Sequence, residues 1–179
     1  SELEKQFPSI NRIADVVLEK ERLIFEIQCS SIPAREVEER NRNYKSLGYQ
    51  VVWILHDKTY NKSRLTAAEY FLQESPHYFT DIDEEGRGKI YDQWDIVNKG
   101  HRLLSMGIKE VFVSSKNLCK KELFPKKSYP LWLKQRIQTW PLFFSGDYID
   151  HFLSLNPHQQ DAFLNELTIK ETQLLKESN

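Results

Sequence analysis

Apolar and polar residues alternate along the first third of the chain, a pattern typical of β-strands whose two faces differ. Further along, the apolar residues take helical spacing, and turn-forming residues separate the segments. This pattern predicts strands at residues 1–7, 10–18, 22–30, 49–55, 77–82, 89–96 and 107–113. It predicts helices at residues 33–47, from 62 or 63 onward, and at 130–140, 147–155 and 157–177, with Ser31 as the first N-cap. A strand, a helix and a buried strand in succession imply a parallel pair, so we expect a mixed sheet with a helix on one face.

The second and third predicted strands form a hairpin around a charged turn, and this turn pairs Leu18 with Leu23. One face of the hairpin is wholly apolar and is expected to lie in the core: Ala14, Val16, Leu18, Leu23, Phe25 and Ile27. The other face carries Ile13, Asp15, Val17, Ile24, Glu26 and Gln28. Asp15 then lies directly opposite Glu26, where like charges destabilise a ladder. A bound cation would neutralise this pair.

Asp15 and Glu26 are hard oxygen ligands, and they suit Mg²⁺ because this ion takes one or two carboxylates and keeps several waters. The carbonyl of Ile27 is a further potential ligand. Gln28 points to the same side as Glu26 and could orient a water or a phosphate oxygen, although it carries no charge and cannot act as a base. A metal here could polarise a phosphoryl group and lower the pKa of a bound water. The alternative is a solvated outer face with no ligand.

Composition limits the possible functions. An apolar fraction of 40% in 179 residues is enough for a packed core. The formal net charge of −1 provides no bulk attraction for nucleic acid, so any such binding needs a local patch. Two cysteines cannot form a disulfide framework, and no apolar run is long enough to span a bilayer, so we expect a cytoplasmic protein.

Composition changes near residue 115, which predicts a first domain at 1–115 and a basic, then helical, region at 116–179. Aromatic residues are interleaved with the basic ones at the start of the second region. Lysines there could neutralise DNA phosphates while Tyr129 or Trp132 stacks on a base. The alternative is a charged linker. The candidate DNA contacts are Lys120, Lys121, Lys126, Lys127 and Trp132.

Four segments, in this order, resemble the nuclease domain of the competence protein CoiA, within the PD-(D/E)xK nuclease superfamily. They are Arg12-Ile13-Ala14-Asp15-Val16, Phe25-Glu26-Ile27-Gln28-Cys29-Ser30, Arg40…Tyr44 and Val52-Trp53-Ile54-Leu55. Gln28 stands where the signature usually has Lys, and Ala14 stands where it usually has Pro. The resemblance implies an α/β fold with a restriction-endonuclease-like mixed β-sheet core flanked by helices, followed here by a C-terminal helical region.

The resemblance also implies metal-dependent hydrolysis of DNA in bacterial competence, DNA uptake and recombination, with DNA and other competence or recombination proteins as partners. Asp15 and Glu26 would hold Mg²⁺ or Mn²⁺, and Gln28 would stand beside the attacking water. Arg40 and Tyr44 resemble the Q-x-x-x-Y element of RecB-type nucleases and would contact DNA phosphate or support the site. Their alternative interpretation is a surface arginine and a core tyrosine.

The chain departs from the family pattern at its start, because a helix normally precedes the first strand and often carries a further acid. We expect Glu2 or Glu4 to supply a third carboxylate instead, and the pattern is consistent with a piece of a longer protein. The missing helix and the neutral Gln28 favour a second hypothesis, a catalytically impaired module that binds DNA or a partner. A third hypothesis is a structural adaptor that contacts no DNA.

Overall fold

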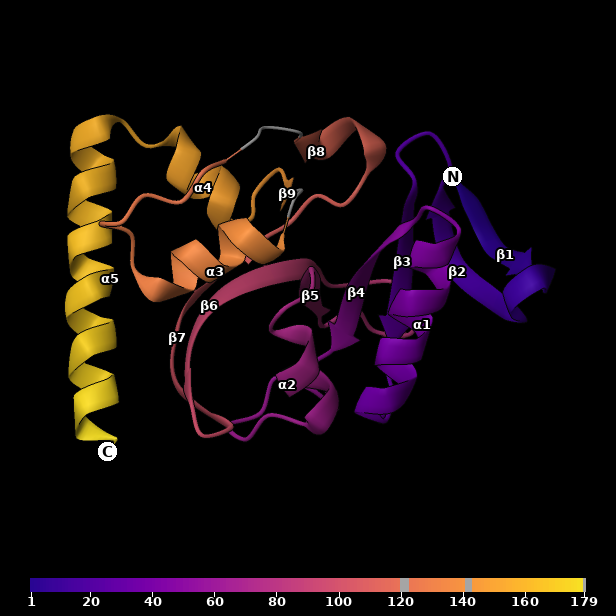
Figure 1. Cartoon of the computed structure of the whole chain (residues 1–179), viewed down its shortest axis with the longest axis horizontal. Coiled ribbons are helices and arrows are strands. Elements are labelled where there is room, and N and C mark those ends of the chain that lie inside the picture. Colours follow the sequence, from indigo (N-terminus) through magenta and orange to yellow (C-terminus); the bar gives the residue numbers. More distant parts are fainter. Residues whose placement is uncertain (120–122, 141–142, 179) are drawn as a thin grey trace. The chain divides into compact units, whose positions relative to one another are not determined.

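The computed structural model describes all residues except 120–122, 141–142 and 179, and divides the chain into two compact units. The N-terminal unit comprises Ser1–Ile90 and the C-terminal unit Tyr91–Asn179. Helices and strands are mixed in the chain (Figure 1), which confirms the α/β fold class. Among the described residues, no helix combines the length and apolar content needed to cross a membrane.

The N-terminal unit contains the first five strands of a seven-stranded mixed sheet, in the order β1-β2-β3-β4-β5. The first three strands are antiparallel, and the pairs β3/β4 and β4/β5 are parallel, as the strand–helix–strand pattern predicted. Its elements are β1 (Glu2–Phe7), β2 (Arg12–Leu18), β3 (Leu23–Gln28), α1 (Ala34–Ser46), β4 (Gln50–His56), α2 (Ala67–Leu72) and β5 (His77–Thr80).

Helix α1 is the crossover between the parallel strands β3 and β4. It begins after Pro33, whose fixed φ suits a helix start, and not after the expected Ser31. Helix α2 also begins later than expected, because Thr66 and Glu69 form a capping box that fixes its first turn.

The hairpin register confirms the pairing predicted from the turn, with Val16 opposite Phe25 and Leu18 opposite Leu23. Both faces of the hairpin are buried near this turn. On the carboxylate face Val17 and Ile24 are fully buried, whereas Ile13 is 59% exposed, so this face is buried near the turn and open at the start of β2. On the apolar face Ile27 is 46% exposed, which corrects the expectation that this whole face is core.

The C-terminal unit is built on a long antiparallel hairpin of β6 (Ile90–Asn98), whose first residue is the last of the N-terminal unit, and β7 (His101–Glu110). The sequence assigned these strands to the first domain, but Trp94 of β6 packs in one cluster with Leu133, Phe152 and Leu167 of the helices. The remaining elements are β8 (Leu118–Cys119), α3 (Leu131–Thr139), β9 (Phe143–Phe144), α4 (Tyr148–Ser154) and α5 (Pro157–Glu177).

Candidate active site

Asp15 and Glu26 come together where the ladder between β2 and β3 ends. The last regular pair is Val16 with Phe25, so the same register places Asp15 opposite Glu26. Beyond that pair, a side chain of β2 takes the place of its backbone as hydrogen-bond acceptor. The Asp15 Oδ2 accepts the Ile27 N–H at 2.7 Å. One carboxylate is therefore held by the backbone of the strand that carries the other.

The Glu26 carboxylate is deeply buried, with only 2% of the residue exposed. Its Oε2 accepts a hydrogen bond from Arg40 of α1 at 3.3 Å. Its Oε1 is buried and has no hydrogen-bond partner in the described part of the chain. Leaving such an oxygen unsatisfied costs roughly 1–3 kcal/mol, more when it is charged.

The surroundings of Glu26 disfavour its charge. Burial raises the pKa of Glu26 to about 7; the nearby Asp15 charge acts in the same direction, while Tyr44 and Arg40 oppose it. Tyr44 is itself fully buried, and burial together with the Glu26 charge raises the pKa of its hydroxyl. The Tyr44 hydroxyl and the Glu26 carboxylate interact with each other, but neither the hydroxyl oxygen nor Glu26 Oε1 has a partner at full hydrogen-bond geometry among the described residues.

Arg40 is held in place by a chain of charges that starts on β2. Glu36 Oε1 accepts from Arg12 Nη1 at 2.5 Å and from Arg40 Nε at 3.0 Å. Arg12 also donates to Asn43 at 3.3 Å. These contacts join α1 to β2 beside it (Figure 1) and fix the guanidinium that reaches Glu26.

The sequence reasoning gave no role to Arg12 or Glu36. The signal for Glu36 was available, because Glu36, Arg40 and Tyr44 are four residues apart and so share one helix face. The signal for Arg12 was absent, since its contacts to α1 depend on how the helix packs on the sheet. The hydrogen bonds from Arg40 and Arg12 hold the pKa of Glu36 below its usual range.

Gln28 lies at the end of β3, and its side-chain amide is hydrogen-bonded to a nearby residue. Its Nε2 donates to the Ser30 carbonyl at 2.9 Å and to the Ser30 hydroxyl at 3.3 Å. The amide nitrogen of Gln28 is thus turned toward Ser30, and a role for Gln28 beside Asp15 and Glu26 stays a prediction.

Glu2 and Glu4 lie on the edge strand β1, and both are exposed. Glu2 forms an ion pair with Lys5 at 3.2 Å. Glu4 has a φ of +48°, and the register between β1 and β2 is the same on both sides of it, so a third carboxylate from β1 stays a prediction. Neither glutamate is among the groups that shift the pKa of Glu26.

Residues 1–90, the whole of the N-terminal unit, match the family model described as competence protein CoiA, nuclease-like domain. The chain belongs to this family. No curated protein and no solved structure matches the chain significantly. The match confirms the resemblance drawn from the four sequence segments and assigns the Asp15–Glu26 face to a CoiA nuclease-like domain.

The CoiA nuclease-like domain offers two carboxylates for a divalent cation, and their chemistry fits Mg²⁺ or Mn²⁺. Within the described ranges no group of three or more His, Cys, Asp or Glu side chains is placed to hold a metal. Two carboxylates and a backbone carbonyl are sufficient for Mg²⁺, which keeps several of its waters. The partnerless Oε1 of Glu26 is the observation that fits a cation, since a ligand bond would satisfy it.

The structure describes three of the five candidate DNA contacts in the C-terminal unit. Lys126 and Lys127 are exposed at a turn before α3. Trp132 is not an open platform for a base, because its ring stacks on Trp94 with centroids 3.5 Å apart. Tyr129 packs edge-on against Phe152 of the same unit. Lys120 and Lys121 lie outside the described residues.

Proposed function

We propose that the CoiA nuclease-like domain hydrolyses DNA phosphodiester bonds with Mg²⁺ or Mn²⁺ held by Asp15 and Glu26. The observation that carries the proposal is the buried Glu26, which converges on Asp15 and keeps one carboxylate oxygen without a partner. Such a charge is costly unless it is paired or bound to a metal. The biological setting that the family suggests is DNA uptake and recombination in the bacterial cytoplasm.

The chain's own residues have separate tasks in this proposal. Asp15 and Glu26 would hold the metal, with the carbonyl of Ile27 as a further ligand. When bound, the metal would polarise the scissile phosphoryl group and lower the pKa of a water. The Ile27 amide orients Asp15, and Arg40 orients Glu26 while supplying one positive charge beside two negative ones.

A second candidate is a catalytically impaired module that binds DNA or a partner. The position of Gln28 favours it, since a neutral amide stands where the related nucleases carry Lys. The amide also donates to Ser30, so it is already engaged at the strand end. A Gln28→Lys variant separates the two candidates: cleavage that appears only in this variant supports the impaired module.

The test is cleavage of supercoiled plasmid and of circular single-stranded DNA in Mg²⁺ or Mn²⁺. We expect Asp15→Asn and Glu26→Gln to lose at least 100-fold in rate, in line with loss of a metal ligand. Glu38→Gln is the matched control, because Glu38 is an exposed glutamate on α1. Equal rates in the parent and in both site variants would remove these carboxylates from catalysis.

A further inference from the structure

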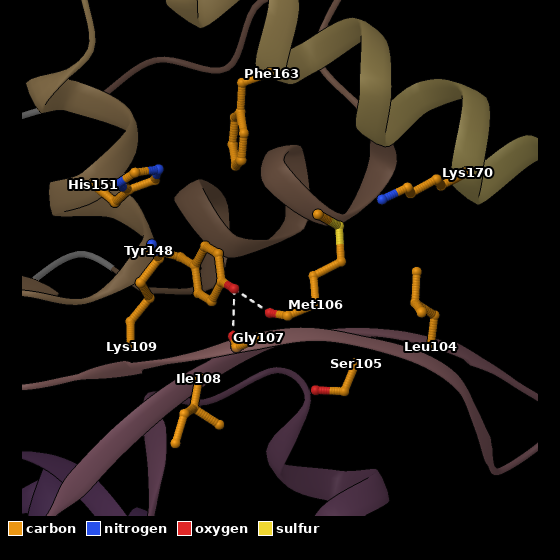
Figure 2. A pocket seen from close by; sticks show the side chains of 10 residues that line it. All are labelled: Leu104, Ser105, Met106, Gly107, Ile108, Lys109, Tyr148, His151, Phe163 and Lys170. Atoms are coloured by element: carbon orange, nitrogen blue, oxygen red, sulfur yellow. Dashed lines mark hydrogen bonds between the residues drawn. The ribbon is translucent and has the colours of Figure 1, made fainter.

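The C-terminal unit contains a pocket of about 400 Å³ between β7 and the helices α4 and α5. Figure 2 shows the side chains of Met106, His151, Phe163 and Lys170 directed toward a common space. A volume of this size is within the usual range for small-molecule sites, which runs from roughly 300 to 1,000 Å³.

The strand that forms the floor of the pocket contains a β-bulge. Asp92 pairs with Lys109 and Trp94 pairs with Met106, so the register shifts by one residue between these pairs. Two residues of β7 therefore oppose the single residue Gln93 of β6. A bulge of this kind reverses the alternation of side chains beyond it and can redirect a side chain.

The bulge changes the side of the strand on which Lys109 lies. In an unbroken strand Lys109 would share a side with Ser105, but here it rises beside Tyr148 on the pocket side (Figure 2). The Tyr148 hydroxyl shares its one proton between the carbonyls of Met106 and Gly107 and so holds the bulge. Gly107 supplies the positive φ of +36° that the bulge requires.

The pocket has two lysines at its edge, Lys109 and Lys170, and Lys170 is paired with a carboxylate. Glu166 pairs with Lys170 at 2.8 Å on the surface, a contact weak enough to be exchanged for a phosphate. Asp150 accepts the Gly146 N–H at 2.8 Å. Lys109 extends over the Tyr148 ring with its Nζ 5.8 Å from the centroid.

The upper wall of the pocket is aromatic. The rings of His151 and Phe163 meet nearly at right angles, with centroids 5.7 Å apart. Burial, with a further contribution from Lys109, lowers the pKa of His151 against the opposing effect of Asp150, which favours the neutral imidazole. The pocket therefore combines aromatic ring surfaces with two lysines, one of which exchanges between Glu166 and a ligand in our proposal.

We propose that this pocket binds one nucleotide of a single-stranded DNA chain, with the base against Phe163 and His151 and flanking phosphates on Lys109 and Lys170. Stacking on aromatic rings beside a basic groove is the usual mode of binding single strands. A duplex would have to unstack and extrude a base to enter such a pocket. The choice of DNA rests on the proposed function, but binding here needs neither the carboxylates nor a metal.

The experiment is fluorescence anisotropy of a labelled 20-nucleotide oligo-dT with the full chain in EDTA, where no hydrolysis interferes. The Lys109→Gln/Lys170→Gln variant should bind more weakly, and its slope of log K against log salt should be shallower by about 1.4, since each single-strand phosphate contact contributes about 0.7. Lys176→Gln, an exposed lysine on the same helix, is the matched control. Phe163→Leu keeps the apolar volume and should weaken binding at least about fivefold through lost stacking.

Several results would overturn the proposal: no binding by the parent chain, an unchanged slope in the double lysine variant, or an equal loss of duplex binding in Phe163→Leu. Displacement of the oligonucleotide by an equal concentration of dTMP would assign the pocket to free nucleotides instead. Weaker single-strand binding in the pocket variants, with duplex binding unchanged, supports the proposal. Because no cleavage is measured, this outcome is independent of whether Asp15 and Glu26 are catalytic.

Discussion

Each unit of the chain buries a carboxylate against an arginine, and the two arrangements differ. In the C-terminal unit Asp92 Oδ2 accepts from Arg136 at 2.6 Å and from the Tyr148 N–H at 3.0 Å. Its Oδ1 accepts the Gln93 N–H at 3.0 Å. In the N-terminal unit Glu26 has one bond of 3.3 Å to Arg40, and its second oxygen has no partner.

The difference indicates that Asp92 and Arg136 form a structural ion pair, whereas Glu26 belongs to a candidate ligand site. Both oxygens of Asp92 are satisfied by the chain itself, so nothing further is required to stabilise its charge. Glu26 lies next to a second carboxylate and has a pKa raised to about 7, so its charge is stabilised incompletely. A buried carboxylate that the fold leaves in this state is a candidate for a function.

The largest change in stability is expected for the structural ion pair between Asp92 and Arg136. Asp92→Ala leaves Arg136 buried without its carboxylate, which should lower the free energy of unfolding by about 3–5 kcal/mol. Urea unfolding followed by tryptophan fluorescence measures this loss. Asp161→Ala, at an exposed position, should change it by less than about 0.5 kcal/mol, and equal losses in the two variants would contradict the assigned role of Asp92.

Replacing the carboxylate of Glu26 in the metal-free chain is expected to raise the free energy of unfolding, the opposite of the effect at Asp92. Because its folded-state pKa lies above the ordinary 4.5, the folded chain binds this proton more tightly than the unfolded chain does. The resulting stability is complete below pH 4.5 and is lost as the pH rises through about 7. Glu26→Gln keeps the group neutral, so in EDTA its advantage over the parent should grow by up to about 3 kcal/mol from pH 4 to pH 8.

Urea unfolding at several pH values measures this change for the parent, Glu26→Gln and the control Glu38→Gln. The control should follow the parent throughout. A constant difference between Glu26→Gln and the parent at all pH values would mean that burial does not disfavour the Glu26 charge.

A smaller effect is expected for the residue that orients Arg40. Glu36→Gln removes the charge that Arg12 and Arg40 share, and we expect Mn²⁺ affinity and single-turnover cleavage to fall by roughly 10-fold, as for groups that support a ligand. The free energy of unfolding should change by less than about 1 kcal/mol, because these groups are partly exposed. An unchanged Mn²⁺ affinity would restrict Glu36 to helix packing.

The smallest effect is expected at Glu2, the candidate third carboxylate. Its side chain is 54% exposed and pairs with Lys5, so Glu2→Gln should leave stability within about 0.5 kcal/mol of the parent. Cleavage and Mn²⁺ affinity should stay within about twofold. A loss as large as that of Asp15→Asn would instead make Glu2 a third ligand and show that the site extends to β1.

The hairpin and its facing carboxylates could be predicted from sequence because they depend on local rules. Strand alternation places Asp15 and Glu26 on one side, and a four-residue turn fixes the register that pairs Leu18 with Leu23. The strand–helix–strand succession in the sequence likewise predicted α1 as the crossover between the parallel strands β3 and β4.

The features that sequence reasoning missed depend on tertiary packing or on single backbone angles. Arg12 reaches Glu36 only because α1 lies on that face of the sheet. Glu4 has a positive φ, a single backbone angle that the strand pattern does not reveal. Trp132 looked like a stacking platform in a basic segment, but the fold places Trp94 against its ring.

The central claim is that the open oxygen of Glu26, together with Asp15, binds a divalent cation. Its most direct test is the midpoint of urea unfolding at pH 7.5 as a function of Mn²⁺ concentration, because a ligand that binds the folded state raises stability with the logarithm of its concentration. We expect the parent and Glu38→Gln to be stabilised, and Asp15→Asn and Glu26→Gln not to respond. Equal stabilisation of all four proteins, or of none, would contradict the account.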